Sequence, residues 1–368
     1  MLAYIARRLL LIVPTLIGIM VINFAIIQAA PGGPVEQIIA QLKGTAVSAT
    51  ARVSGAGGET VGGAAPQSGA GQATTQYRGA RGIDPVLIKQ LEKQFGFDKP
   101  LWERFLLMMG NYLRFDFGNS FFKDRRVVDL VIEKMPVSVS LGLWTTLLAY
   151  LISIPLGIAK ALRDGSRFDI WTSGVIVVSY AIPSFLFAIL LVVLFSGGSY
   201  LQWFPLRGLV SENWHQLNLF HKVTDYLWHI TLPILALVIG SFATLTILTK
   251  NSFLAEIHKQ YVLTARAKGL TERRVLYGHV FRNGMLIVIS GMPSAFISIL
   301  FTSTLLIEVI FSFDGMGLLG FQAAVGRDYP IMFGTLYFFT LLGLVMNLVG
   351  DLTYMLVDPR IDFEARES

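Results

Sequence analysis

Six apolar runs place the strongest constraint on this chain, because each has at least 20 residues and none contains Asp, Glu, Lys or Arg. A run of about 20 such residues crosses the hydrocarbon core of a bilayer as a helix. Backbone polar groups must be paired internally there, and the runs lack the alternation of barrel strands, so helices are predicted. The runs are residues 9–29, 137–159, 170–196, 229–249, 284–307 and 331–350.

The composition favours the same fold class. Hydrophobic residues make up 54% of the 368 residues, charged residues make up 15%, and the mean hydropathy is +0.60. These values lie outside the balance of a soluble globular chain. The chain has no Cys, which excludes disulfides, thiol catalysis and cysteine-ligated metal sites. The sequence therefore predicts an all-α integral membrane protein with six transmembrane helices.

Basic residues in the short loops predict the orientation. With the N-terminus in the cytoplasm, fourteen Lys and Arg residues lie inside, and three lie in the two short outer loops. Both termini are therefore predicted to be cytoplasmic. The first run is predicted to be a retained helix rather than a signal peptide, because its apolar core is longer than the roughly 15 residues of a signal peptide. The predicted parts are the N-terminus with helix 1 (1–30), an extracytoplasmic segment (31–136), a core with helices 2 to 6 (137–357) and a cytoplasmic tail (358–368).

The extracytoplasmic segment has two parts of different character. Residues 44–82 contain ten Gly and nine Ala among 39 residues, which is too little apolar surface to offset the entropy of ordering. We expect this stretch to reach an extracytoplasmic partner. Residues 83–136 carry helical signals: Asp84 as an N-cap before Pro85, then apolar residues at helical spacing through residues 101–112 and 124–134. This small helical cap either packs on the membrane domain or forms a docking surface, and both roles are compatible.

The sequence lacks the motifs of an enzyme active site. The five His form neither H-x-x-x-H nor H-E-x-x-H, and no P-loop pattern is present, so no catalytic residue, metal site or cofactor is predicted in this chain. Ion-coupled transport needs carboxylates at mid-membrane depth, whereas the acidic candidates lie at span ends. For the two amides, a helix–helix hydrogen bond is the commoner role of a polar residue inside a bundle. Four polar residues are candidates for lining a translocation path: Asn23, Glu308, Asn347 and Asp351.

The cytoplasmic loop at residues 250–284 reads as a helix, a break and a second helix. Gly269 is predicted to form a left-handed C-terminal cap, and Thr271 is predicted to be the N-cap of a helix with Glu272 in its first turn. The basic residues of the loop alone indicate only orientation. The capped pattern predicts a short rigid helix that projects from the membrane.

Several motifs in order along the chain resemble those of one family, the inner-membrane permeases of ABC importers for oligopeptides, dipeptides and nickel. They include Pro31-Gly32-Gly33-Pro34, Gly118-Asn119-Ser120, residues 261–270 (Y-V-L-T-A-R-A-K-G-L), residues 308–312 (E-V-I-F-S), Arg327-Asp328-Tyr329-Pro330 and residues 358–362 (D-P-R-I-D). Within the family, the resemblance is strongest to a subgroup of peptide importers that also takes up microcin C. It covers nearly the whole chain except residues 44–82.

The resemblance implies a type I ABC importer permease in the bacterial inner membrane. It implies a second permease subunit, two cytoplasmic ATPase domains that bind ATP and Mg²⁺, a periplasmic peptide-binding protein, membrane lipid and a peptide substrate, with no nucleic acid as partner. Leu263 stands where the family motif begins with an acidic residue, and Asp314 stands where most relatives have Pro. The residues that match the ATPase-coupling helix are Thr264, Ala265, Arg266, Ala267, Lys268, Gly269, Leu270, Thr271, Glu272, Arg273 and Arg274.

Two other classes remain as alternatives at the level of sequence. One is a secondary transporter or channel that works without ATP, which the lack of mid-span carboxylates disfavours. The other is a membrane scaffold whose outer segment tethers a partner. The prolines inside the spans suit a bundle that opens around a path, but Pro is also common in ordinary membrane helices.

Overall fold

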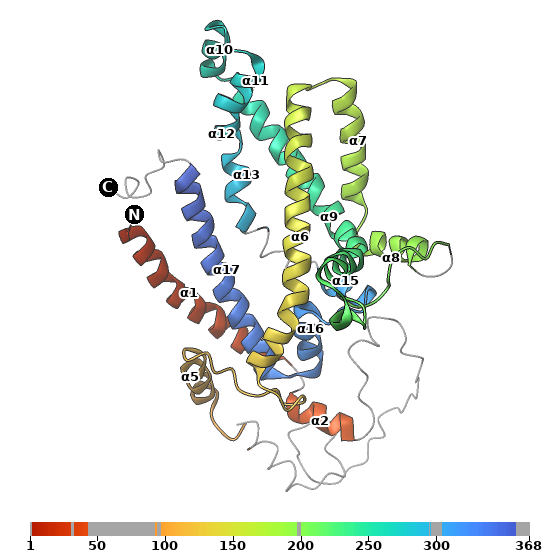
Figure 1. Cartoon of the computed structure of the whole chain (residues 1–368). Helices are drawn as coiled ribbons and strands as arrows, with labels where there is room; N and C mark the ends of the chain where they lie inside the picture. The colour runs from red at the N-terminus through yellow and green to blue at the C-terminus, as the bar shows by residue number, and fades with distance from the viewer. Residues whose placement is uncertain are drawn as a thin grey trace, which may run out of the picture. The chain divides into compact units, whose positions relative to one another are not determined.

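The computed structural model describes residues 2–30, 33–42, 93, 97–196, 200–293, 295 and 304–357 (Figure 1). Within these ranges the secondary structure is helical, and the extended pairing is confined to one isolated bridge between Asn119 and Arg126. The longer helices are α1 (Leu2–Ala29), α5 (Leu101–Tyr112), α6 (Val127–Leu162), α7 (Arg167–Ala181), α8 (Ser184–Phe195), α9 (Leu219–Ile257), α16 (Met316–Gly326) and α17 (Tyr329–Val357). The shorter ones are α2 (Pro34–Leu42), α10 (Gln260–Ala267), α11 (Glu272–Val275), α12 (Phe281–Gly284), α13 (Leu286–Ser290), α15 (Thr304–Ile310), a 3₁₀ turn (Trp214–Gln216) and a π-helix (Leu276–Val280).

Four of these helices, α1, α6, α9 and α17, are long and apolar enough to cross a membrane, and α7 with α8 makes up to five. They coincide with five of the six predicted runs. The all-α membrane fold is therefore confirmed, while the count of six stays a prediction. Nine of the 24 residues of the fifth run, 284–307, lie outside the described residues, as do residues 44–82, most of residues 84–96 that begin at the predicted N-cap, and the tail 358–368.

The third predicted span is not one straight helix. α7 and α8 meet at an angle of 94°, with Ile182 in an extended conformation (φ −86°, ψ 116°) and Pro183 as the N-cap of α8. Proline pushes the residue before it out of the helical region, which explains the break. Proline does not interrupt α6 in the same way. This helix runs from Val127 through Pro136 and Pro155 to Leu162, so most of the helical segment predicted at 124–134 and the second predicted span form one continuous helix.

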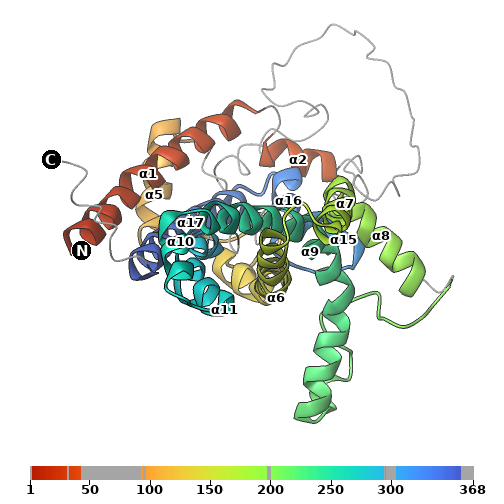
Figure 2. The same cartoon turned by 90° about the horizontal axis from the view of Figure 1, so that it is seen from above.

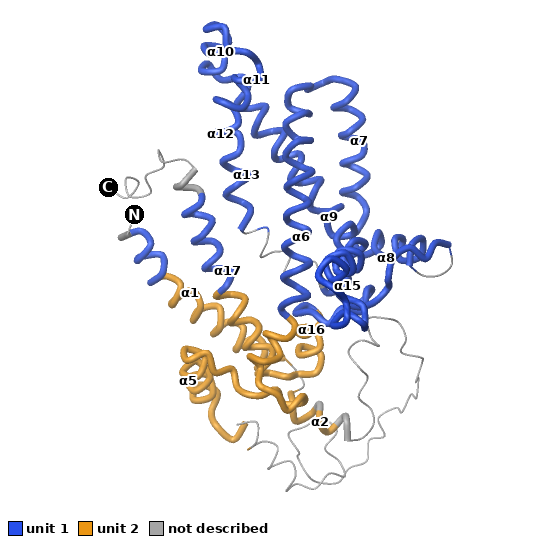
Figure 3. The backbone as a smooth tube through the Cα atoms, viewed as in Figure 1, with its two compact units in different colours: residues 1–10, 135–317, 342–368 blue, residues 11–134, 318–341 orange. Residues whose placement is uncertain are grey.

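The chain divides into two compact units, coloured separately in Figure 3. Unit 1 comprises Met1–Leu10, Met135–Gly317 and Leu342–Ser368. In unit 1, α7 and α8 both pack against α9 (Figure 2). One apolar core joins α6, α8, the first half of α9 and α15, and a second joins the ends of α6 and α9 to residues 262–288. The second core holds in place the loop that the sequence singled out.

Unit 2 comprises Leu11–Lys134 and Leu318–Leu341. Its centre contains an aromatic cluster in which Tyr112, Phe117 and Tyr337 pack with ring centroids 4.9 to 5.6 Å apart. The buried Ser120 hydroxyl donates to the buried Asp328 carboxylate at 2.5 Å, and the Phe121 N–H donates to the same carboxylate at 3.2 Å. These bonds tie the segment before α6 to the turn between α16 and α17.

Candidate functional site

The predicted helix–Gly–helix pattern forms a projection, defined here as residues 260–284, at one end of unit 1 (Figure 1). α10 ends at Ala267, and Gly269 adopts a left-handed conformation with φ +78°. The Leu270 N–H donates to the Ala265 carbonyl at 3.3 Å, and the Gly269 N–H donates to the Arg266 carbonyl at 2.9 Å. This pair of bonds is the Schellman motif, which satisfies the last carbonyls of a helix. The predicted cap is confirmed.

The second helix of the projection also begins where the sequence placed it. Thr271 is the N-cap of α11 in an extended conformation (φ −64°, ψ 148°), and Glu272 lies in the first turn. The Thr271 side chain makes no capping hydrogen bond, so its backbone rather than its hydroxyl starts the helix. The Arg266 guanidinium bridges the two helices, with Nε 2.9 Å and Nη2 3.0 Å from the two carboxylate oxygens of Glu272.

One face of the projection is buried and the opposite face is open. Val262, Ala265 and Val275 pack into the second core of unit 1 with exposures of 6% or less. The exposed residues of the predicted coupling segment are Thr264, Arg266, Ala267, Lys268, Gly269, Thr271, Glu272, Arg273 and Arg274, while Leu270 is half-buried. The open face is thus basic and contains four Arg and Lys side chains beside one carboxylate.

Short contacts hold the projection to α9. The Tyr261 hydroxyl donates to the Glu256 carboxylate at 2.7 Å, and the Ser252 hydroxyl donates to the Gly284 carbonyl at 2.7 Å. Burial, together with the nearby Glu256 carboxylate, raises the pKa of Tyr261, so its hydroxyl stays a donor at neutral pH. A Cβ added at Gly284 would lie 3.1 Å from the Phe253 ring, so the ring of α9 packs closely on the Gly284 backbone. These contacts attach the projection directly to α9.

An ion cluster lies where the α6–α7 turn meets α9. Lys160 is 1% exposed, and its Nζ lies 2.8 Å from the Asp169 carboxylate and 2.8 Å from the hydroxyls of Thr172 and Ser173. Lys250 of α9 donates to both Asp169 oxygens, at 2.8 and 2.9 Å, and lies 2.7 Å from Asp164. Asp169 therefore joins three helices through two lysines, and we call Lys160, Asp164, Asp169 and Lys250 the ion cluster.

Close helix packing supports the ion cluster. A Cβ at Gly157 would lie 2.6 Å from the Thr249 Cβ and 2.9 Å from the Thr246 carbonyl, so α6 and α9 approach too closely for any larger residue. Such small-residue contacts are typical of helix pairs in membranes. The sequence reasoning missed the ion cluster. Its only signal was that Lys160, Asp169 and Lys250 stand directly at the ends of three apolar runs.

The four path candidates make different local contacts. Glu308, in α15, is fully buried, and its carboxylate accepts from the Ser138 hydroxyl and the Gly317 N–H, each at 3.3 Å. Asp351 lies 3.0 Å from Arg8 and accepts from the Tyr4 hydroxyl at 3.2 Å. The Asn23 amide donates to the Ile19 carbonyl of its own helix at 2.8 Å, and Asn347 is exposed on α17.

Glu308 stabilises the turn that follows α15. A Cβ at Gly315 would overlap the Glu308 carboxylate, so glycine is needed at this position. The Ser138 hydroxyl that donates to Glu308 accepts in turn from the Met316 N–H at 2.9 Å. The carboxylate therefore organises the turn into α16. Among the described residues, no group of three or more His, Cys, Asp or Glu is placed to hold a metal ion.

Apolar helices of membrane-spanning length with a capped projection at one end define an α-helical integral membrane protein. The family model described as "Binding-protein-dependent transport system inner membrane component" matches residues 153–363, which include the ion cluster and the projection. The chain belongs to this family, and the family resemblance inferred from its motifs is confirmed.

Curated relatives match along nearly the whole chain. The "Peptidoglycan transport system permease protein YejB" of Agrobacterium fabrum is 63% identical over 365 residues, which cover 99% of both chains. The "Inner membrane ABC transporter permease protein YejB" of Escherichia coli O157:H7 is 59% identical, covering 99% of this chain and 100% of the relative. The "Oligopeptide transport system permease protein AppB" of Bacillus subtilis is 31% identical, with the same two coverages.

Proposed function

We propose that this chain is a transmembrane permease subunit of an ATP-driven importer of peptides, including microcin C-like peptides. The family and the names of the relatives support a transport role, and two of the three relatives carry a peptide or peptidoglycan cargo in their names. The chain contributes half of the translocation path and has no catalytic residue. ATP and Mg²⁺ are bound by the partner ATPase subunits, which hydrolyse the ATP.

The observation that carries the proposal is the capped projection fused to α9. Its open basic face, from Thr264 to Arg274, is the surface that docks on an ATPase, and its buried face is continuous with the core of unit 1. When the ATPases close on ATP, the projection moves and α9 moves with it. The ion cluster then transmits this motion from α9 to the α6–α7 hairpin, because Lys250 and Lys160 share Asp169.

The proposed topology follows the basic residues of the loops. Six helices cross the inner membrane, both termini are cytoplasmic, and residues 31–136 lie in the periplasm. A second permease completes the path, and a periplasmic binding protein delivers peptide from the outer side. Asn23, Glu308, Asn347 and Asp351 are proposed to line or support the path, with Glu308 acting through the turn that it organises.

The test is ATP hydrolysis in lipid by the complex that co-purifies with a tagged copy of this chain, measured with and without peptide-loaded binding protein. Co-purifying ATPases that the loaded binding protein stimulates are the expected result. A chain that purifies without an ATPase and moves solute down an ion gradient would instead identify a secondary transporter, the rival class, and would overturn the proposal.

Two variants test the coupling surface itself. Gly269→Pro removes the N–H that caps α10 and cannot adopt φ +78°, and Arg266→Glu reverses a charge on the open face. Both are expected to abolish stimulated hydrolysis and uptake while membrane insertion stays normal. Arg207→Glu, a charge reversal in a predicted outer loop, is the control. Normal uptake by both coupling variants would show that the segment from Thr264 to Arg274 does not dock on an ATPase.

A further inference from the structure

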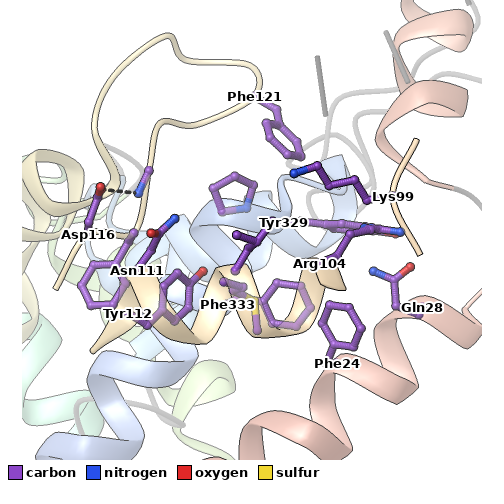
Figure 4. Close-up of a pocket in the computed structure, with 15 residues that line it drawn as sticks. Phe24, Gln28, Lys99, Arg104, Asn111, Tyr112, Asp116, Phe121, Tyr329 and Phe333 are labelled. Atoms are coloured by element: carbon purple, nitrogen blue, oxygen red, sulfur yellow. Dashed lines mark hydrogen bonds between the residues drawn. The ribbon is translucent and has the colours of Figure 1, made fainter. Parts of the chain in front are cut away.

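Unit 2 contains a cavity of about 320 Å³ that the transport role described above leaves unused (Figure 4). Four stretches far apart in the chain form its walls: the end of α1, α5 with Lys99 two positions before it, the segment at residues 116–121, and the start of α17. Two of the family-like motifs contribute lining residues, namely Gly118 and the pair Tyr329-Pro330. These motifs are thus brought together by the fold at one place.

The apolar walls of the cavity are aromatic and mutually packed. The Phe24 ring lies 5.7 Å from Phe333, which lies 6.0 Å from Tyr329. On the other side, Tyr112 packs on Phe117 at 4.9 Å. Burial raises the pKa of Tyr112, so this wall stays uncharged at any physiological pH. Rings packed against one another in this way form a preformed pocket for an apolar or aromatic group.

Hydrogen-bond donors gather on one side of the cavity. Gln28, Lys99 and Arg104 lie together there, whereas Asn111 and Asp116 lie opposite (Figure 4). The Gln28 Nε2 is buried and has no hydrogen-bond partner within the part of the chain that the structure describes. A buried donor without a partner destabilises the fold, and a ligand acceptor would remove that cost. Within the described residues, the Gln28 amide nitrogen therefore lacks an acceptor.

The charges on the donor side are arranged for an anion. The Arg104 guanidinium is fixed 4.1 Å above the Phe97 ring, and Lys99 pairs with Glu103 at 3.5 Å in an exposed contact that exchanges readily with water. The one lining carboxylate, Asp116, accepts from the Gly118 N–H at 3.1 Å and lies on the far side. The cavity thus presents two cations and an unpaired amide at one side and rings at the other.

We propose that this cavity binds the C-terminal end of a cargo peptide, with the carboxylate at Gln28, Lys99 and Arg104 and an apolar side chain against Phe24 and Phe333. Its volume lies at the lower end of the range of about 300–1,000 Å³ for ligand pockets, so it accommodates an end group rather than a whole peptide. The inference rests on the proposed function, since it requires unit 2 to face the side from which peptide arrives.

The test uses the complete co-purified complex in phosphatidylcholine nanodiscs, without the binding protein. The probes are Ala-Ala-Phe with a free carboxylate and the same peptide as its C-terminal amide, and binding is measured by calorimetry. Because charge-assisted hydrogen bonds discriminate by about 1.5 kcal/mol or more, the acid is expected to bind about tenfold more tightly than the amide. Equal affinities would overturn the inference.

Variants assign that preference to the cavity. Arg104→Gln is expected to reduce the acid-to-amide ratio to about one, and Arg104→Lys is expected to retain most of it. Gln28→Glu, which is nearly isosteric, is expected to weaken binding of the acid peptide and to leave binding of the amide peptide unchanged. Arg114→Gln, an exposed cation of the same unit outside the cavity, is the matched control and is expected to retain the full ratio. If Arg114→Gln also loses the acid-to-amide ratio, the acid preference does not come from the cavity.

Two further readouts separate the possible failures. If phosphatidylglycerol added to the nanodiscs displaces the peptide and the displacement requires Arg104, the cavity belongs to a lipid headgroup and the inference fails. ATP hydrolysis stimulated by loaded binding protein is measured on the same preparations. Stimulation without any acid preference overturns this inference alone, whereas the absence of any ATPase overturns the proposed function.

Discussion

The projection and the ion cluster lie in the same unit and contain ion pairs of almost the same length, yet their surroundings differ. Arg266 and Glu272 approach to 2.9 Å with side-chain exposures of 38% and 71%. Lys160 and Asp169 approach to 2.8 Å with side-chain exposures of 2% and 9%. Water screens the first pair, so it contributes little, whereas removal of either partner in the second leaves a buried charge. Distance alone therefore does not rank the two pairs.

The largest expected effect comes from the buried pair. Asp169→Ala leaves Lys160 buried without its carboxylate, and we expect the free energy of unfolding to fall by about 3–5 kcal/mol. Asp164→Ala, which removes a 48% exposed carboxylate from the same cluster, is the control and is expected to cost less than about 1 kcal/mol. Denaturant titration of the purified chain measures both. Equal losses would mean that burial does not determine how much each carboxylate contributes to the free energy of unfolding.

A second variant tests the packing beneath the ion cluster. Gly157→Ala places a methyl group 2.6 Å from the Thr249 Cβ, so α6 and α9 must move apart next to Lys160 and Lys250. We expect a loss of about 1–3 kcal/mol in the free energy of unfolding. Gly174→Ala, where an added Cβ meets nothing within 4 Å, is the matched control. Unchanged stability in Gly157→Ala would show that the helices separate without cost.

The third prediction concerns the cap of the projection. Gly269→Ala forces a Cβ into a left-handed conformation at φ +78°, with an expected loss of about 1 kcal/mol. Gly269→Asn, which tolerates this conformation better, is expected to lose less. Protease sensitivity of the projection in the purified complex reports the local opening. If the Gly269→Asn and Gly269→Ala variants are cleaved equally fast, the left-handed cap is not what holds α10 and α11 together.

The smallest expected effect belongs to the exposed pair. A double-mutant cycle with Arg266→Ala and Glu272→Ala is expected to give a coupling energy below about 1 kcal/mol, and it should shrink in high salt. The same Arg266→Ala variant is expected to lower stimulated ATP hydrolysis clearly, while its free energy of unfolding changes little. A coupling energy above 2 kcal/mol would place this pair in the same class as the buried one.

Sequence reasoning was most successful where structure depends on near neighbours in the chain. The left-handed Gly269, the N-cap Thr271 and the helix at residues 101–112 were all predicted correctly. It was less successful at Pro183, which was predicted to lie inside a span, and at Pro136, which was predicted to end the segment before a span. The first breaks its helix by 94° and the second does not. The local rule for proline is the same at both, so packing around the helix decides the outcome.

The uncharged runs by themselves determined a helical membrane protein, because an apolar stretch in a bilayer must satisfy its own backbone hydrogen bonds. The cap of the projection was equally determined, because its bonds join residues within five positions of one another. Only the tertiary structure decided that Lys250 meets Asp169, 81 residues away, and that residues from Phe24 to Phe333 surround one cavity. Such contacts depend on how distant helices pack, which no local pattern in the chain records.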